Sequence, residues 1–314
     1  STCIHQQARL SPGAYYHLSI RARMKLAILS RLIKPARVAA VGSTIMGAYL
    51  FGDVGGSKAE DHGGRGRLRV IFIRHGESEN NILCRVSFDH YKKYRKPDPK
   101  LSKLGEAQAL AAADYFEKNP PVVSPISQIL VSPMTRALMT AKPIAEKLKL
   151  APVVWADLYE VGGCFGGQEG NFWGDGGLKR SDMKTQFPKF KLPSNITEKG
   201  WYPRGLKKES TEHGQRRAAA LAERLRDMAM GVEGDKNVLV VAHFDTIDLL
   251  MRNLLEINAD VKDTHPGVVC QHYNAALSCI DIDSKATRPA KLLFANRADH
   301  LPYDLVDWEN LGIV

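Results

Sequence analysis

Short apolar runs alternate with amphipathic stretches along residues 68–301, and this alternation predicts the elements of the fold. Runs rich in β-branched residues predict buried strands at 68–73, 126–131, 153–155, 237–242, 277–282 and 291–294. Stretches with helical character lie between them, at 102–118, after 132, at 211–230 and after 243. Strands that alternate with helices predict an α/β fold with a doubly wound, mostly parallel central sheet flanked by helices.

Polar side chains emerge where two of these strands end. The first strand runs into Arg74 and His75 and is cut off by Gly76, and the strand at 237–242 runs into His243. Ligands of open α/β sheets bind beyond the carboxyl ends of the strands. A fixed cation and two imidazoles are therefore expected at one ligand site, on strands that would be neighbours in the sheet.

Two motifs resemble signatures of the histidine phosphatase (phosphoglycerate mutase-like) superfamily. The first is Arg-His-Gly-Glu-Ser at 74–78, and the second is Ser-Pro-x-x-Arg-Ala-x-x-Thr-Ala at 132–141, which contains Arg136. A helix that opens with arginine after a strand suits phosphate, because helix N-termini favour anions and a guanidinium binds two phosphate oxygens. The segment 101–109 resembles a third, structural element of the family, and Ser102 is expected to cap its helix.

The resemblance implies a phosphoryl transfer reaction and assigns roles to this chain's residues. Neutral His75 would attack phosphorus and form a phosphohistidine. Four residues would surround the phosphoryl oxygens, namely Arg74, Asn81, Arg136 and His243. Glu160, which lies in a Leu-x-Glu context after the strand at 153–155, would donate and accept the proton. His75, Glu160 and His243 are thus the expected catalytic residues, and the reaction requires no cofactor and no metal.

Two departures from the family pattern leave alternatives open. Residues 82–88 differ from the stretch that mutases of the family carry, which favours a phosphomonoester hydrolase over a phosphoglycerate mutase. Phe244 stands where the family has glycine after the second histidine, which predicts altered loop geometry and reduced activity. A non-enzymatic or weakly active subunit of a mitochondrial membrane complex, retaining the fold, is the remaining alternative. The substrate is expected to be a phosphorylated small molecule or a phosphoprotein.

An insertion is predicted at about residues 161–211. Its first part, Gly162–Gly177, holds eight glycines and three large aromatic residues and is expected to form a wall of the active site. The remainder combines aromatic anchors with many basic residues and is expected to cap the pocket and determine substrate choice.

The net charge of +10 comes mostly from one end of the chain. Residues 1–52 contain seven basic residues and no acid, which leaves 37 of the 44 basic residues against all 34 acidic ones in residues 53–314. Because no nucleic-acid-binding motif accompanies this charge, nucleic acid is not an expected partner. The five scattered cysteines form no CxxC pair and indicate neither a zinc site nor a disulfide framework.

The sequence therefore predicts two parts, a basic and apolar arm at 1–67 and a catalytic domain at 68–314. Residues 38–52 are uncharged, and with the following glycines they make a marginal membrane segment at 38–56. An acid-free basic arm is typical of mitochondrial targeting. We therefore expect a mitochondrial protein that associates with the inner membrane or a larger assembly through residues 1–56.

Overall fold

The computed structural model describes residues 66–119, 125–168, 170–202, 208–257, 270–283, 285 and 290–307. The predicted membrane segment at 38–56, and nearly all of the predicted arm, lie outside these residues, so the expectations of membrane and mitochondrial association stay predictions. Within the described ranges, no helix combines the length and the apolar character that crossing a membrane requires.

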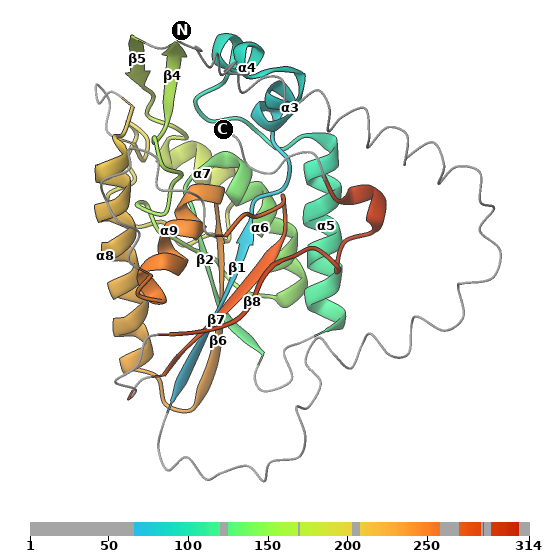
Figure 1. Cartoon of the computed structure of the whole chain (residues 1–314), viewed down its shortest axis with the longest axis vertical. Coiled ribbons are helices and arrows are strands. Elements are labelled where there is room, and N and C mark those ends of the chain that lie inside the picture. The colour runs from blue at the N-terminus through green and yellow to red at the C-terminus, as the bar shows by residue number, and fades with distance from the viewer. Residues whose placement is uncertain are drawn as a thin grey trace, which may run out of the picture. The chain divides into compact units, whose positions relative to one another are not determined.

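Six strands form one central sheet (Figure 1). They are β1 (Arg67–Arg74), β2 (Ile126–Val131), β3 (Val153–Val154), β6 (Asp235–Ala242), β7 (Leu277–Asp283) and β8 (Lys291–Arg297). Their order is β3-β2-β6-β1-β7-β8. The first four strands in this order are parallel to one another, whereas β7 pairs antiparallel with both β1 and β8. The predicted mostly parallel sheet is confirmed.

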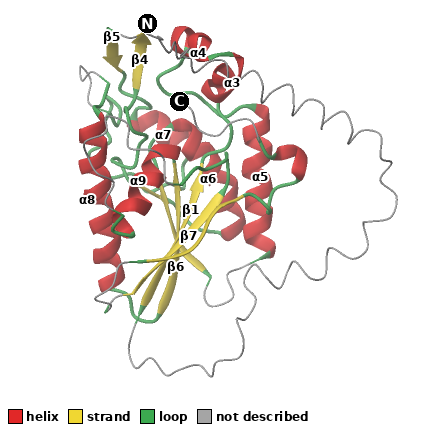
Figure 2. Ribbon diagram, viewed as in Figure 1, coloured by secondary structure: helices red, strands yellow, loops and turns green. Residues whose placement is uncertain are grey.

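Helices cover both faces of this sheet (Figure 2). Helices α5 (Lys103–Lys118) and α6 (Thr135–Leu148) pack on one face, and α8 (Thr211–Met230) and α9 (Phe244–Leu254) pack on the other.

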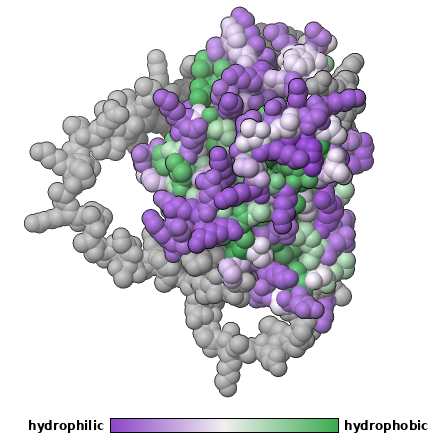
Figure 3. Space-filling model, turned by 180° about the vertical axis from the view of Figure 1, so that it is seen from behind, coloured by the Kyte–Doolittle hydropathy of each residue, from purple (hydrophilic) through white to green (hydrophobic). Residues whose placement is uncertain are grey.

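Strand β1 contributes to both cores because its side chains point alternately to opposite faces. Ile71 and Ile73 lie in the core with α5 and α6, whereas Val70 and Phe72 lie in the core with α8 and α9. All four side chains are buried, and each stabilises the fold by about 1.5–3 kcal/mol. On the side seen in Figure 3, hydrophilic side chains cover most of the described surface.

Two segments hold elements that the sequence pattern did not predict. The polar connection after the first motif contains α3 (Glu79–Val86) and α4 (Phe88–Tyr94). The glycine-rich stretch forms a hairpin of β4 (Phe165–Gln168) and β5 (Asn171–Gly174), and α7 (Arg180–Gln186) follows it. The longest of these elements has eight residues, which is too few to show the periodicity by which longer elements are recognised.

Candidate active site

The two predicted histidines follow adjacent parallel strands. Strands β1 and β6 pair in a register that places Arg74 opposite Ala242. The next residue of each strand, His75 and His243, therefore emerges at the same edge of the sheet. Their ring centroids lie 5.1 Å apart. The predicted juxtaposition of the two imidazoles is confirmed.

Two hydrogen bonds fix which nitrogen of His75 carries the proton. The Nδ1 atom lies 2.7 Å from the carbonyl oxygen of Gly76, and because a carbonyl oxygen only accepts, Nδ1 carries the hydrogen. Nε of Arg136 donates to Nε2 of His75 over 3.1 Å, and because a guanidinium only donates, Nε2 offers its lone pair. His75 therefore presents an unprotonated Nε2, which is what a nucleophile requires.

Burial keeps both imidazoles neutral. The pKa of His75 lies well below its usual range because burial disfavours the charged ring, and because Arg136 and Arg74 repel a further positive charge. Burial and Arg136 lower the pKa of His243 in the same way. The positive surroundings of His75 therefore preserve its nucleophilic lone pair at neutral pH.

His243 is enclosed beside His75 and does not itself line the cavity in front of it. Its Nε2 atom lies 2.6 Å from the hydroxyl oxygen of Ser132, the residue that directly follows β2. Its Nδ1 atom is buried without a hydrogen-bond partner. The structure thus places His243 next to the predicted nucleophile, while its catalytic role stays a prediction.

Arg136 is positioned by the start of helix α6. The helix has no side-chain cap of its own. Instead, the carboxylate of Asp98 accepts hydrogen bonds from the backbone N–H and the hydroxyl of Thr135, at 2.9 and 2.8 Å. One turn further on, Thr140 donates its hydroxyl to the carbonyl oxygen of Arg136 and accepts from the N–H of Gly76. Thr140 thus connects the second motif, at 132–141, to Gly76 of the first motif by a hydrogen bond.

The segment 101–109 supports the first motif from the other side. Gly76 and Gly105 are in close backbone contact, since a Cβ atom on Gly76 would lie 2.5 Å from the carbonyl oxygen of Gly105. Ser102 caps helix α5 as predicted, by accepting from the N–H of Gly105 at 3.0 Å. The side chain of Gln108 accepts from the N–H of Glu77 at 2.7 Å. These contacts fit the structural role expected for this segment.

Three guanidinium groups line the cavity, and within the described residues none of them forms a salt bridge with a carboxylate. They belong to Arg74, Arg95 and Arg136. The other buried arginines of the described chain are paired, Arg217 with Glu209 and Arg252 with Asp248. Because an uncompensated buried charge is costly, unpaired guanidiniums at a cavity indicate a site for an anion.

Arg74 is held by the end of the sheet. Its Nη1 atom donates to the carbonyl oxygen of His272 at 2.6 Å, and its buried Nε atom has no partner. Burial lowers the pKa of Arg74 to about 10, and the nearby carboxyl group of Glu160 acts in the opposite direction. The side chain therefore remains a cation at neutral pH.

Phe244 does not separate the two imidazoles. Its buried ring packs against Arg74, with 5.1 Å between the ring centroid and the guanidinium carbon. His243 has an ordinary extended backbone, and α9 begins directly after it. The expected distortion of this loop is therefore not reflected in the placement of His243, and the effect of Phe244 on the reaction rate stays a prediction.

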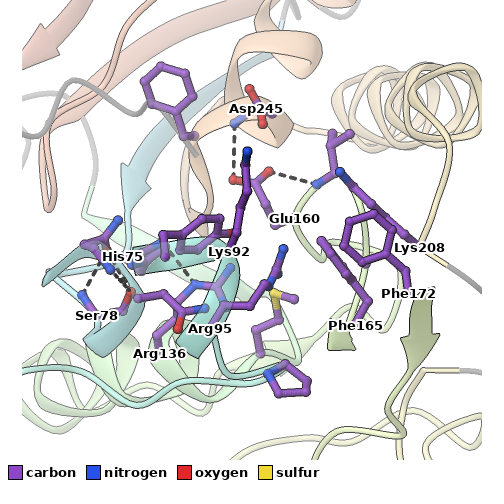
Figure 4. Close-up of a pocket in the computed structure, with 18 of the residues that line it drawn as sticks. His75, Ser78, Lys92, Arg95, Arg136, Glu160, Phe165, Phe172, Lys208 and Asp245 are labelled. Atoms are coloured by element: carbon purple, nitrogen blue, oxygen red, sulfur yellow. Dashed lines mark hydrogen bonds between the residues drawn. The ribbon is translucent and has the colours of Figure 1, made fainter. Parts of the chain in front are cut away.

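Glu160 lies across the cavity from His75 (Figure 4), at the N-terminus of helix α9. Its Oε1 atom accepts from the N–H groups of Val161 and Thr246, at 2.9 and 3.0 Å, and from the hydroxyl of Thr246. Its Oε2 atom accepts from the N–H of Asp245 at 3.3 Å. These bonds fix the carboxyl group at the positive end of the helix dipole.

Asp245 supplies a second carboxyl group that the sequence analysis did not identify. It also lines the cavity. Burial, followed by the negative charge of Glu160, raises the pKa of Asp245 to about 8, although Arg74 acts in the opposite direction. At neutral pH Asp245 therefore keeps its proton. A carboxyl group with a raised pKa beside a second carboxyl group suits acid–base chemistry.

The loop that carries Glu160 is clamped by a buried ion pair. Arg217 of α8 forms two hydrogen bonds with Glu209, at 2.9 and 2.6 Å. Arg217 also donates to the carbonyl oxygens of Asp157 and Tyr159, while Glu209 accepts from the hydroxyl of Tyr159. The position of Glu160 thus depends on helix α8.

Asn81 lines the cavity, but the oxygen of its side-chain amide is already engaged in hydrogen bonds. Its Oδ1 atom accepts from the N–H and the hydroxyl of Ser78, at 2.9 and 2.8 Å, which closes the capping box of α3. The amide nitrogen is therefore the atom that remains for a phosphate.

One cavity of about 470 Å³ brings most of the predicted site together (Figure 4). Arg74, His75, Asn81, Arg136 and Glu160 all line it. Phe165 and Phe172 of the predicted wall and Lys208 of the predicted insertion also line it. Four further lining residues that bear on its chemistry were not predicted: Tyr91, Lys92, Arg95 and Asp245. Several of the lining residues belong to α4 and to the hairpin, whose placement at the site depends on tertiary packing. Among the described residues, no cluster of three or more potential metal ligands is found.

Comparison with known proteins decides the family. A sequence model of the histidine phosphatase superfamily (branch 1) matches residues 70–293. The chain belongs to the histidine phosphatase superfamily. The matched range contains the predicted site residues His75, His243, Arg74, Arg136 and Glu160.

Curated proteins that resemble this histidine phosphatase superfamily member match it over part of their length. A bifunctional protein of Mycobacterium tuberculosis is 29% identical over 200 residues, which are 63% of this chain and 48% of that protein. The chain thus spans about half the length of the curated relatives it matches.

Solved structures of similar fold include two phosphatases. One is a mycobacterial glucosyl-3-phosphoglycerate phosphatase, with 22% identity and a TM-score of 0.47, covering 74% of this chain and all of that one. The other is a phosphoserine phosphatase from Entamoeba histolytica, with 21% identity and a TM-score of 0.47, covering 75% of this chain and all of that one.

Proposed function

We propose that this protein hydrolyses phosphate monoesters of small molecules through a phosphohistidine formed on His75. The observation that carries the proposal is the unprotonated Nε2 of His75, which Arg136 holds at a cavity lined by unpaired guanidinium groups. Membership of the superfamily supports phosphoryl chemistry. A cavity of about 470 Å³ is within the range typical of small-molecule sites.

In the first step, Nε2 of His75 attacks phosphorus in line with the ester oxygen. The P–N bond forms as the P–O bond breaks, and negative charge spreads over the phosphoryl oxygens. Arg74, Arg136 and the amide of Asn81 stabilise this charge. The leaving oxygen takes the proton held by the Glu160–Asp245 pair and departs as an alcohol.

In the second step, water attacks the phosphohistidine. The carboxylate pair, now short of one proton, takes a proton from the water as the P–O bond forms and the P–N bond breaks. His75 returns to its neutral form, the pair regains its proton, and inorganic phosphate leaves. The net reaction consumes one ester and one water and releases one alcohol and one phosphate.

Trapping the intermediate tests the proposal. The protein is mixed with a ³²P-labelled aryl phosphate, quenched in alkali and digested, and the label is expected on the peptide that contains His75. The His75→Ala variant should acquire no label and should lose at least about 10³-fold in kcat, because it lacks the nucleophile. Retained turnover in this variant, or a folded wild-type protein that neither labels nor turns over, would refute the proposal.

A mutase would be distinguished by the fate of the phosphoryl group. A hydrolase releases inorganic phosphate, whereas a mutase converts 3-phosphoglycerate to 2-phosphoglycerate and releases little phosphate. We expect phosphate release to exceed isomerisation. The reverse ratio would show that the phosphohistidine returns its phosphoryl group to the substrate.

A further inference from the structure

The cavity carries more positive charge than one phosphate requires. Arg74 and Arg136 are buried at its base, whereas Lys92 and Arg95 are half-buried and Lys208 is exposed. The described lining therefore holds five cations against two carboxyl groups, those of Glu160 and Asp245, of which Asp245 keeps its proton at neutral pH. A phosphate monoester carries at most two negative charges, which Arg74 and Arg136 at the base can balance, so the positive charge of Arg95 remains for a second anionic group.

Arg95 is the clearest member of this outer group. It follows helix α4 directly, and its guanidinium carbon lies 3.5 Å from the ring centroid of Phe165 and 5.0 Å from that of Tyr91. Its Nε atom is shielded from solvent without a hydrogen-bond partner. The rings fix the guanidinium in position by cation–π contact, but within the described residues no carboxylate neutralises it.

The two lysines extend the same surface. Lys208 lies over Phe165 and Phe172, with 5.1 and 5.3 Å from Nζ to the ring centroids. Lys92 lies over Phe88 at 4.6 Å, and its 3.5 Å contact with Asp89 is a solvent-exposed ion pair of little energetic weight. Figure 4 shows Lys92, Arg95 and Lys208 around the same cavity as His75 and Glu160.

The hairpin β4–β5 supplies the apolar part of this wall. Phe165 and Phe172 are in edge-to-face contact, with ring centroids 5.2 Å apart. This aromatic wall lies between the cations at the base of the cavity and those at its mouth. It suits a substrate whose flat or apolar carbon skeleton separates two anionic groups.

We propose that Arg95, together with Lys92 and Lys208, forms a second anion subsite, and that the preferred substrates are small phosphate monoesters that carry a second anionic group. This inference rests on the proposed phosphatase function and specifies its substrate class. The phosphate occupies the base beside His75, the carbon skeleton lies along the aromatic wall, and a carboxylate or second phosphate binds Arg95.

Matched ester pairs test the subsite. The 3- and 4-carboxyphenyl phosphates are compared with the corresponding carbamoylphenyl phosphates, which have the same shape without the second charge. We expect kcat/KM for at least one carboxylate to exceed that of its amide by about tenfold or more, because a charge-assisted hydrogen bond to Arg95 is gained. Equal values for both pairs would overturn the subsite and leave the phosphatase proposal standing.

The variant Arg95→Gln locates the effect. We expect the ratio of carboxylate to amide kcat/KM to fall toward one in this variant. The matched control is Lys93→Gln, which removes an exposed cation that does not line the cavity, and it should keep the wild-type ratio. A wild-type ratio in Arg95→Gln, with circular dichroism confirming the fold, would overturn the assignment to Arg95.

Binding separates the subsite from the chemistry. The same esters are titrated calorimetrically into the His75→Ala variant, where hydrolysis cannot interfere. Tighter binding of the carboxylate, lost in His75→Ala/Arg95→Gln, would support the subsite even if no ester is turned over. Equal affinity for carboxylate and amide would refute it, whatever the fate of the hydrolysis assay.

Discussion

The lone pair of His75 depends on its immediate neighbours. The carbonyl oxygen of Gly76 and the guanidinium of Arg136 together leave Nε2 unprotonated, and the positive charge of Arg136 opposes protonation of the ring. One arginine thus orients the nucleophile, tunes its pKa and contacts the space where a phosphate would bind.

Replacing Arg136 by Met should affect rate and pH dependence together. We expect kcat/KM to fall by about 10²–10³-fold, because a donor to the transition state is lost. Since Arg136 lowers the pKa of His75, its removal should raise that pKa, and the fall in activity on the acid side should begin at a higher pH. A pH profile of kcat/KM measures both effects.

The control for this variant is Lys142→Met, which removes an exposed charge from the same helix. Its profile should match that of the wild type. An unchanged acid limb in Arg136→Met would contradict the electrostatic role assigned to this arginine.

Asp245 should make activity sensitive to alkaline pH. Its pKa is raised to about 8, so its proton is present below that pH and is lost as the pH rises through it. If this proton protonates the leaving group, kcat should decline by about tenfold per pH unit above 8. Asp245→Asn should slow phenyl phosphate strongly and 2,4-dinitrophenyl phosphate little, because the latter leaving group needs no acid. Equal slowing of both esters would argue against this role.

The sequence identified the residues that lie within recognisable motifs, and the structure places these together. Arg74 and His75 end a strong strand pattern, and Arg136 opens a helix after another. Asp98 and Asp245 were missed for a physical reason. Each acts by packing against a segment remote in sequence, so no local pattern distinguishes it from a solvent-exposed acid.

Among the elements, helix α8 influences the site without contributing a residue to the lining of the cavity. Its Arg217 binds Glu209 and the carbonyl oxygens of the loop that ends in Glu160. This pair is nearly inaccessible to solvent, with exposed side-chain fractions of 7% and 2%. The Arg217–Glu209 ion pair therefore contributes both to the free energy of unfolding and to the position of Glu160.

Arg217→Ala should reduce the free energy of unfolding by about 3–5 kcal/mol, because it leaves Glu209 charged and buried. It should also reduce kcat, since the loop carrying Glu160 loses its anchor. Urea unfolding followed by circular dichroism measures the first effect. The control is Arg224→Ala on the same helix, whose pair with Asp157 is 44% and 46% exposed and which should cost about 1 kcal/mol. Similar losses of unfolding free energy in both variants would contradict the role assigned to the Arg217–Glu209 pair.

Long elements were predictable from sequence and short ones were not. The predicted positions are close to those observed for strands β1, β2 and β6 and for helices α5 and α8. Each of these elements is long enough for its apolar residues to show a clear strand or helix pattern. Helices α3 and α4 have eight and seven residues, and the strands of the hairpin have four each. Their stability comes from caps and from packing at the cavity, which local sequence does not reveal.

For the molecule as a whole, the described residues that line the cavity all lie between positions 74 and 245. The two cores use residues from 68 to 306, and residues 61–314 form one compact unit. The machinery of the proposed reaction and the packing that supports it thus belong to this unit.

A chain of residues 61–314 should therefore fold and retain kcat within about twofold of the full protein, because it keeps every described side chain of the cavity. Circular dichroism, thermal unfolding and aryl phosphate hydrolysis provide the measurements. A truncated chain that unfolds would show that residues 1–60 contribute to the fold, and one that folds without activity would show that they contribute to the site.

The central position of β1 has a consequence for synthesis of the protein. Its partners arrive late, since Arg67 and Asp235, which pair across β1 and β6, are 168 positions apart. At roughly 5–20 residues per second, a ribosome needs on the order of ten to thirty seconds to supply the second strand. Throughout that interval, β1 is an apolar strand of the nascent chain whose partner strands β6 and β7 have not yet been made. Removing chaperones from a cell-free translation system should therefore cause aggregation of nascent chains that end before residue 235.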